Sequence, residues 1–161
     1  IHHLEEHTIF NFIEWKLQYF YHSAAALSTE AILAILTCIL VTFALLHLVK
    51  NDRASAHVIL FMLFAIQVIN AFYHIFFSFY FSDFSPGAIT AALLYLPVNF
   101  LIAQAAFREG YLKSYFEYGC IAFLGTTTFI LFEIIGPLII AMAIIFSLMY
   151  YFYFNKRLSN N

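Results

Sequence analysis

The most polar stretch of the chain lies at its start, where three imidazoles and two carboxylates fall within Ile1-His2-His3-Leu4-Glu5-Glu6-His7. If this segment is helical, His2 lies four residues before Glu6 and His3 lies three residues before it, so the side chains can meet on one face. Imidazoles and carboxylates held together can bind a metal ion or transfer a proton. The spacing therefore predicts a site of chemistry at the amino terminus.

A second polar stripe interrupts an apolar stretch, where Gln67, Asn70 and His74 recur three and four residues apart and Ser78 continues the row. On a helix these four residues share one face. An imidazole inside a membrane is costly unless it faces the interior of a bundle. We therefore expect His74 to reach the amino-terminal cluster, and a packing hydrogen bond to a neighbouring helix is the alternative. The predicted catalytic residues are His2, Glu5, Glu6, Asn70 and His74.

Three chemical interpretations of the cluster stay open. It can be a metal site, a metal-free acid–base pair in which burial raises the pKa of the carboxylate, or a structural polar cluster. A catalytic zinc, iron or manganese ion needs about three protein ligands and one open position. Carboxylate-bridged di-iron bundles use repeated Glu-x-x-His pairs, whereas here the order is reversed and occurs once. The candidate metal ligands are His2, His3, Glu6 and His74.

The composition places the whole chain in a membrane. Of its 161 residues 64% are hydrophobic and only 10% are charged, and the mean hydropathy is +0.88, which leaves too little polar surface for a soluble globule. The net charge of −2 excludes the basic face of a nucleic-acid-binding protein. The two cysteines, Cys38 and Cys120, lie in apolar runs and do not indicate a disulfide framework.

The elements that must position the cluster are membrane-spanning helices. We predict an all-α, polytopic transmembrane helical bundle that forms a single membrane domain over residues 1–161, with an interfacial or partial helix at the amino terminus. Gly136-Pro137 divides the last apolar run, which favours two spans over one broken helix. Pro97 predicts a kink, and His22, His47 and His57 near span ends are interpreted as interfacial. The five predicted spans are 24–49, 57–81, 88–107, 118–135 and 137–155.

The basic residues predict the orientation. Six of the seven basic residues fall on one side of the alternating spans, and such residues mark the cytoplasmic side. We therefore expect a multi-pass protein of the cytoplasmic membrane whose carboxyl terminus is cytoplasmic. Glu30, Glu133 and His74 then lie in the outer half of the membrane with the amino-terminal cluster. The six residues are Lys50, Arg53, Arg108, Lys113, Lys156 and Arg157.

Two motifs resemble a known family. The run His2-His3-Leu4-Glu5-Glu6, followed by Trp15, is similar to the defining motif of the HXXEE domain family of small bacterial integral membrane proteins. Asn70-Ala71-Phe72-Tyr73-His74 and then Phe84-Ser85-Pro86-Gly87-Ala88-Ile89-Thr90 with Pro97 resemble its second block, and the likeness extends to about residue 104. The resemblance implies a bacterial inner-membrane protein and marks His2, Glu5, Glu6, Asn70, His74 and the Pro86-Gly87 turn, but it implies no reaction.

These observations support more than one function. We expect a membrane-embedded enzyme with an outward-facing His/Glu pocket that acts on a lipid or another apolar substrate. The alternative is a non-catalytic structural subunit of a larger membrane complex, and a transporter is a weaker third choice because no inverted repeat is evident. The expected partners are membrane lipids, other membrane proteins or further copies of the chain, and no nucleic acid. Since the chain starts without a Met, we expect a further membrane helix before Ile1.

Overall fold

The computed structural model describes residues 1–20 and 29–158, and it describes the side chains of all of these except His3, Thr29, Glu30, Arg157 and Leu158. Within these ranges the chain is helical, with no strand, as predicted. Five helices are long and apolar enough to cross a membrane, which confirms the predicted number of spans. They are Ala31–Lys50, Arg53–Tyr80, Ala88–Arg108, Tyr115–Ile135 and Leu138–Lys156.

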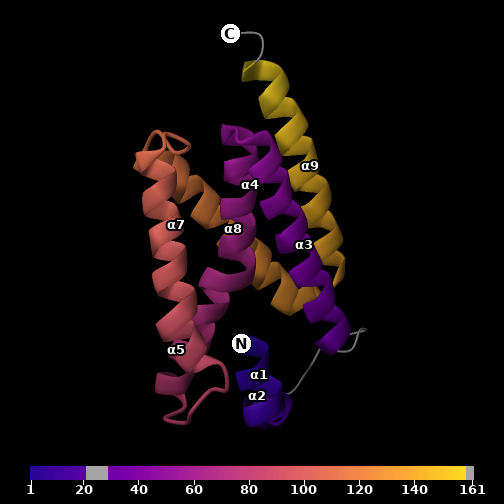
Figure 1. Cartoon of the computed structure of the whole chain (residues 1–161). Helices are drawn as coiled ribbons and strands as arrows, with labels where there is room; N and C mark the ends of the chain where they lie inside the picture. The colour runs from indigo at the N-terminus through magenta and orange to yellow at the C-terminus, as the bar shows by residue number, and fades with distance from the viewer. Residues whose placement is uncertain (21–28, 159–161) are drawn as a thin grey trace.

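The amino-terminal segment is a short helical hairpin that lies beside one end of the bundle (Figure 1). It consists of α1 (His2–Leu4), the π-helical segment η1 (Glu5–Ile9) and α2 (Phe12–Tyr19). The side chain of Asn11 accepts a hydrogen bond from the backbone N–H of Glu14 and so caps α2. The π-helical turn directly after α1 sets the direction in which the two glutamates point.

Two of the spans contain a π-helical turn in their interior. The second span joins α4 (Arg53–Leu63), η2 (Phe64–Val68) and α5 (Ile69–Tyr80), and the third joins α6 (Ala88–Thr90), η3 (Ala91–Tyr95) and α7 (Leu96–Arg108). Pro97 is the second residue of α7, two residues after the end of η3. A proline lacks the N–H that a regular helix needs at an interior position, so the widened turn before it accommodates the ring.

The remaining spans are single helices: α3 (Thr29–Lys50), α8 (Tyr115–Ile135) and α9 (Leu138–Leu158). Gly136, at φ +92°, ends α8, and Pro137 separates it from α9, so the last apolar run forms two spans. Both α4 and α8 begin before the predicted starts at 57 and 118. Asp52 and Ser114 cap these helices with their side-chain oxygens, so the polar residues that follow each cap form the first helical turn.

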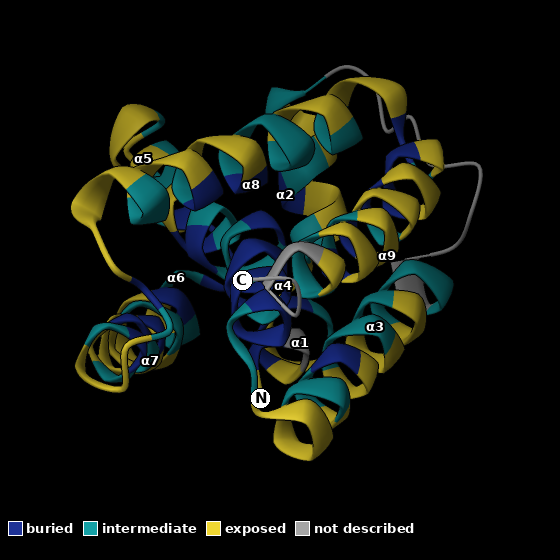
Figure 2. Ribbon diagram, turned by 90° about the horizontal axis from the view of Figure 1, so that it is seen from above, coloured by how far each residue is buried: buried dark blue, intermediate teal, exposed yellow. Residues whose placement is uncertain are grey.

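The helix α4 stands at the centre of the bundle. Figure 2 shows it surrounded by the other spans, with its residues mostly buried and the outer faces of its neighbours mostly exposed. Half of the residues of the second span are buried, against 6% for the first. Gly125 of α8 packs so closely on η2 that a Cβ there would lie 2.5 Å from Cβ of Phe64. This close crossing fixes α8 against the central helix.

The two ends of the bundle differ in charge. The end of α3, the start of α4 and the loop from α7 to α8 lie on the side of the carboxyl terminus (Figure 1). Lys50 ends α3, Arg53 begins α4, Arg108 ends α7, and Lys113 lies in the loop before α8. The hairpin of α1, η1 and α2, with its imidazoles and carboxylates, lies at the opposite end. The sequence-predicted site and the basic loops are therefore separated by the length of the spans.

Candidate functional site

Three buried side chains from distant parts of the chain meet at the end of the bundle that holds the amino terminus. They are His2 of α1, Glu6 of η1 and His74 of α5, which are 6%, 8% and 0% exposed. Nε2 of His74 lies 3.0 Å from Oε1 of Glu6, and Nε2 of His2 lies 3.4 Å from the same oxygen. One ligand atom from each residue lies within 4.8 Å of the others. The sequence reasoning had placed these three residues in one site.

The other ring nitrogen of each histidine is held by a hydroxyl group. Nδ1 of His2 lies 2.5 Å from Oγ1 of Thr90, and Nδ1 of His74 lies 3.0 Å from Oγ of Ser85. The Thr90 hydroxyl donates to the carbonyl of Gly87, so it accepts from His2, which assigns the proton of His2 to Nδ1. Nε2 of His2 is then an acceptor, and the amide N–H of Asn70 lies 3.0 Å from it. The two hydroxyls thus fix how both rings are oriented.

Glu5 positions the site without pointing into it. Its carboxylate accepts hydrogen bonds from the backbone N–H groups of Gly87, Ile89 and Thr90, at 3.2, 3.0 and 2.8 Å. These groups form the first turn of the third span, where backbone N–H groups have no helical partner and favour an anion. Although burial favours the neutral acid, these hydrogen bonds lower the pKa of Glu5 below its usual value. The pair Glu5-Glu6 therefore divides into a cap and a site residue.

Gly87 brings the backbone of the turn directly against the three site residues. Its φ of +102° is in the left-handed region that favours glycine. A Cβ at this position would lie 2.7 Å from Cε1 of His2, 3.0 Å from Cε1 of His74 and 3.2 Å from Cγ of Glu6. Glycine is thus required at position 87 for two reasons: the positive φ of the turn and the close approach of the three side chains.

Glu6 remains ionised at neutral pH although it is buried. Burial favours the neutral acid, but the neighbouring His2 and His74 outweigh it and hold the pKa of Glu6 at about 2. The expectation that burial raises the pKa of the carboxylate is therefore wrong for this residue. Among the described residues Glu6 has no Lys or Arg partner, and its ion-pair contacts are imidazoles. The nearest of these ring nitrogens are Nε2 of His74 and Nε2 of His2, at 3.0 and 3.4 Å.

Asn70 completes the polar side of the site. Its amide Nδ2 lies 3.0 Å from Nε2 of His2, on the side away from Thr90. The third member of the stripe, Gln67, instead accepts a hydrogen bond from Asn99 of α7 at 2.9 Å. Of the four residues in the predicted row, Asn70 and His74 belong to the site, Ser78 supports it by accepting from the backbone N–H of Ser85, and Gln67 serves helix packing.

Other predicted residues lie elsewhere. The side chains of His3 and Glu30, like the whole of His22, lie outside the described residues. Glu133 forms an ion pair with Lys16 at 2.8 Å and so connects α8 to α2. It does not take part in the contacts between the two histidines and Glu6.

A large cavity opens at the site. It has a volume of about 750 Å³, and its polar lining includes His2, Glu6, Asn70 and Tyr95 together with the Lys16–Glu133 ion pair. The remaining walls come mainly from aliphatic and aromatic side chains of α3, of the central span and of α9. A cavity of this size, largely apolar and with a few convergent polar groups, is typical of a ligand-binding site.

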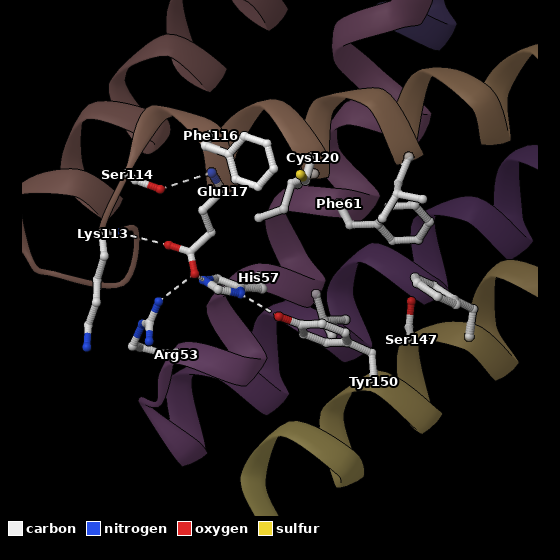
Figure 3. A pocket seen from close by; sticks show the side chains of 14 residues that line it. Arg53, His57, Phe61, Lys113, Ser114, Phe116, Glu117, Cys120, Ser147 and Tyr150 are labelled. Atoms are coloured by element: carbon white, nitrogen blue, oxygen red, sulfur yellow. Dashed lines mark hydrogen bonds and ion pairs between the residues drawn. The ribbon is translucent and has the colours of Figure 1, made fainter. Parts of the chain in front are cut away.

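A second pocket, of about 450 Å³, lies near the basic end of the bundle (Figure 3). There Arg53 binds Glu117 at 2.5 Å, and His57 lies 2.7 Å from the hydroxyl of Tyr150. His57 is only 2% exposed, so its interpretation as an interfacial residue is wrong. These polar groups satisfy one another, and the cluster ties α4 to α8 and α9.

The sequence reasoning did not give functional roles to Thr90, Ser85 or Tyr95. Thr90 and Ser85 orient the two imidazoles, and the ring of Tyr95 packs on His2 with the centroids 4.6 Å apart. Thr90 and Ser85 stand in the stretch from Phe84 to Thr90 that resembles a family motif. That motif was the only signal in the sequence that pointed to them.

Comparison with known proteins gives one match. A family model described as "Protein of unknown function with HXXEE motif" matches residues 1–102. No curated protein and no solved structure matches the chain. The matched range includes all three residues of the site, both hydroxyl groups that hold the rings, and Glu5.

Proposed function

The chain belongs to the HXXEE family, and on the basis of its site we propose that it is a membrane-embedded enzyme. The proposed substrate is a lipid or another long apolar molecule, whose polar group reacts beside His2, Glu6 and His74. His2, Glu6 and Asn70 border the cavity and would contact the substrate, while His74 lies behind them and would act through Glu6. Acid–base chemistry and metal-assisted chemistry are both open to these residues.

The observation that carries this proposal is the cavity of about 750 Å³, which His2 and Glu6 border and whose other walls are mostly apolar, apart from the Lys16–Glu133 ion pair and a few further polar side chains. Buried polar residues in a membrane bundle are costly, so their position beside a cavity indicates a functional role. Natural ligand sites span roughly 300–1,000 Å³, and this cavity falls in that range.

The length of the cavity fits one lipid chain. Its walls include Asn70, one turn before His74, and Met62 further along the same span. At about 1.5 Å per residue, the distance along the helix from Asn70 to Met62 is roughly 12 Å. This is slightly less than half of the ~30 Å hydrocarbon core, so the cavity can hold most of a chain that spans a single leaflet. The polar group of such a lipid would lie at the site, and its chain would extend toward the bilayer centre.

We also propose an orientation. The loops that carry Lys50, Arg53, Arg108 and Lys113 would face the cytoplasm, because basic residues are enriched there. The carboxyl terminus would then be cytoplasmic, and the site would open near the outer surface of a bacterial inner membrane.

The proposed enzyme is tested by following lipid composition. Wild type and Glu6→Gln would be reconstituted into vesicles made from a bacterial lipid extract, and lipid species would be followed by mass spectrometry. We expect one lipid class to be consumed by the wild type and spared by Glu6→Gln. Glu14→Gln, an exposed carboxylate of α2, is the matched control and should behave as wild type. Equal turnover by Glu6→Gln, or no lipid change with any variant, would overturn the proposal.

A second candidate function is that of a non-catalytic subunit of a larger membrane assembly. The observation that favours it is α3, of which only 6% is buried, so most of its surface is free to contact lipid or a partner. Native mass spectrometry of the protein extracted in detergent would distinguish the two. A stable monomer that turns over lipid supports the enzyme, and a defined hetero-complex without turnover supports the subunit.

A further inference from the structure

We propose that Nε2 of His2, the carboxylate of Glu6 and Nε2 of His74 bind one divalent transition-metal ion, with an open coordination position toward the cavity. Zn²⁺ and Fe²⁺ are the ions that two imidazoles and one carboxylate commonly serve. The inference rests on the proposed function for what the ion does there. The inference that the ion binds rests only on the arrangement of the three side chains.

The separations of the donor atoms match a small coordination sphere. Ligands about 2.0–2.1 Å from a tetrahedral ion lie about 3.3 Å from one another. The two nitrogen-to-Oε1 distances, 3.0 Å for His74 and 3.4 Å for His2, bracket this value. All three donor atoms lie within 4.8 Å of one another, so an ion can contact them after small side-chain rotations.

One of the donor atoms has no other partner. Nε2 of His74 is completely buried and makes no hydrogen bond of acceptable angle, although it lies close to Glu6. A buried polar atom without a partner costs free energy, and native proteins rarely leave one unexplained. A metal ion between this nitrogen and Glu6 would use its lone pair.

The groups behind the donors are those that a metal site needs. Metal-binding histidines usually form a hydrogen bond through their second ring nitrogen, which fixes the tautomer and the ring orientation. Thr90 does this for His2 and Ser85 does it for His74. Ser85 is in turn held by the hydroxyl of Ser78, which accepts from its backbone N–H at 2.9 Å. Both supports belong to the turn and helix start that Glu5 holds in place.

The surroundings of Glu6 also leave room for a cation. Its side chain is buried, and no Lys or Arg of the described residues pairs with it. With its proton on Nδ1, Nε2 of His2 can act as a metal ligand 3.4 Å from this carboxylate, once the Asn70 amide that now contacts it turns aside. A divalent cation between the two groups would be attracted to both.

The open position would face the polar end of the cavity, because His2 and Glu6 border it and His74 does not. Asn70 lies beside His2 there and can hydrogen-bond to a water molecule or to the polar group of a substrate. A metal ion at this place would polarise a carbonyl or phosphoryl oxygen, and it would lower the pKa of a bound water.

The test measures metal content separately from activity. The full chain would be expressed with Zn²⁺ and Fe²⁺ in the medium and purified in detergent without chelator, and metal per polypeptide would be determined by mass spectrometry. We expect about one equivalent of one of the two ions in the wild type. In Glu6→Gln, and in His74→Ala where it folds, we expect at least a tenfold loss. Glu14→Gln and His47→Asn are the matched controls and should retain the ion.

A second measurement keeps the inference testable if a variant folds poorly. Zn²⁺ added to the metal-free protein should raise the Tm of wild type but not of Glu6→Gln, because only a folded state that binds the ion is stabilised. A wild type that takes up less than a tenth of an equivalent, or a Glu6→Gln variant that binds as the wild type does, overturns the metal site. Metal binding without lipid turnover would instead overturn the proposed enzyme alone.

Discussion

Oε2 of Glu5 accepts a 2.8 Å hydrogen bond from the backbone N–H of Thr90, whose hydroxyl group holds the ring of His2. The two glutamates of the motif therefore both act on His2, Glu6 by direct contact and Glu5 through Thr90. Glu6 meets the imidazoles directly, and Glu5 fixes the start of the third span that supports them. The hairpin at the amino terminus is joined to the bundle through these bonds.

We predict that Glu5→Gln destabilises the protein, although Gln has nearly the same shape as Glu. Gln has one acceptor oxygen, so at least one of the three backbone N–H groups would face its amide NH₂. Hydrogen bonds to charged groups contribute about 1.5–3 kcal/mol each, and a loss of this order should lower the Tm in detergent. Glu14→Gln is the control, and equal Tm values for the two variants would show that the cap is unimportant.

Gly87→Ala should disturb the site as well as strain the backbone. A left-handed residue other than glycine costs about 1–2 kcal/mol. At Gly87 the added Cβ also meets His2 and His74, whereas at Gly110, with φ +79°, it meets nothing within 4 Å. We expect Gly87→Ala and Gly110→Ala both to lose stability, and only Gly87→Ala to lose binding of the proposed ion. Retention of the metal by both would contradict the close approach seen at Gly87.

Thr90→Val should weaken metal binding without removing a ligand. The change keeps the shape of the side chain but deletes the hydroxyl that orients His2, and loss of such a support typically costs about 10–100-fold in metal affinity. Competition with a fluorescent zinc chelator would measure it. Thr127→Val is the matched control, because that hydroxyl binds only the carbonyl of Phe123 in its own helix. The same affinity in both variants would exclude a supporting role for Thr90.

Gly125→Ala should loosen the bundle away from the site. The added Cβ would lie 2.5 Å from Cβ of Phe64 and 3.1 Å from the backbone nitrogen of Ala65, so α8 must move. Overpacking of this kind costs about 1–3 kcal/mol. Gly119→Ala on the same helix meets nothing within 4 Å and should gain up to about 1 kcal/mol from helix propensity. The Tm should therefore be highest for Gly119→Ala, intermediate for the wild type and lowest for Gly125→Ala. The reverse order would contradict the close crossing of α8 and η2.

Asp52 should make stability depend on pH in the acid range. Burial favours its neutral form, but hydrogen bonds from Ser55, Asn155 and Tyr151 outweigh this and lower its pKa. A lowered pKa in the folded state gives a stabilisation that is complete above the unfolded value of about 3.9 and is lost as the pH falls through the folded value. The stability difference between wild type and Asp52→Asn should therefore shrink below about pH 4. A stability difference that stays constant over this pH range would contradict the prediction for Asp52. Glu109→Gln, at an exposed position, is the control and should differ little from the wild type at any of these pH values.

Much of the fold was predictable because hydropathy alone determines which segments can cross a membrane. The five spans follow from uninterrupted apolar runs, and Gly136-Pro137 divides the last of them. The starts of α4 and α8 were placed too late because Asp52 and Ser114 cap polar first turns that read as loop. The π-helical segments leave no such signal, since a widened turn has the same composition as a regular one.

The centre of the site was predictable for a different reason. His2, Glu6 and His74 are titratable groups in an apolar chain, and the helical spacing of the first two brings them together. Thr90 and Ser85 carry no charge, and a threonine in a membrane helix commonly bonds its own backbone, as Thr126 does here. Only the folded turn at Gly87 shows that two hydroxyls of this chain serve the imidazoles instead.

Every group that contacts or orients the proposed ion lies before residue 91, whereas α8 and α9 supply cavity wall and no ligand. The last two helices can thus vary in sequence without touching a ligand of the proposed ion, although α3 and the central span also shape the cavity. Under the proposed function, exchanging α8 and α9 for those of another family member should change which apolar molecules fit and leave the ion-binding residues as they are.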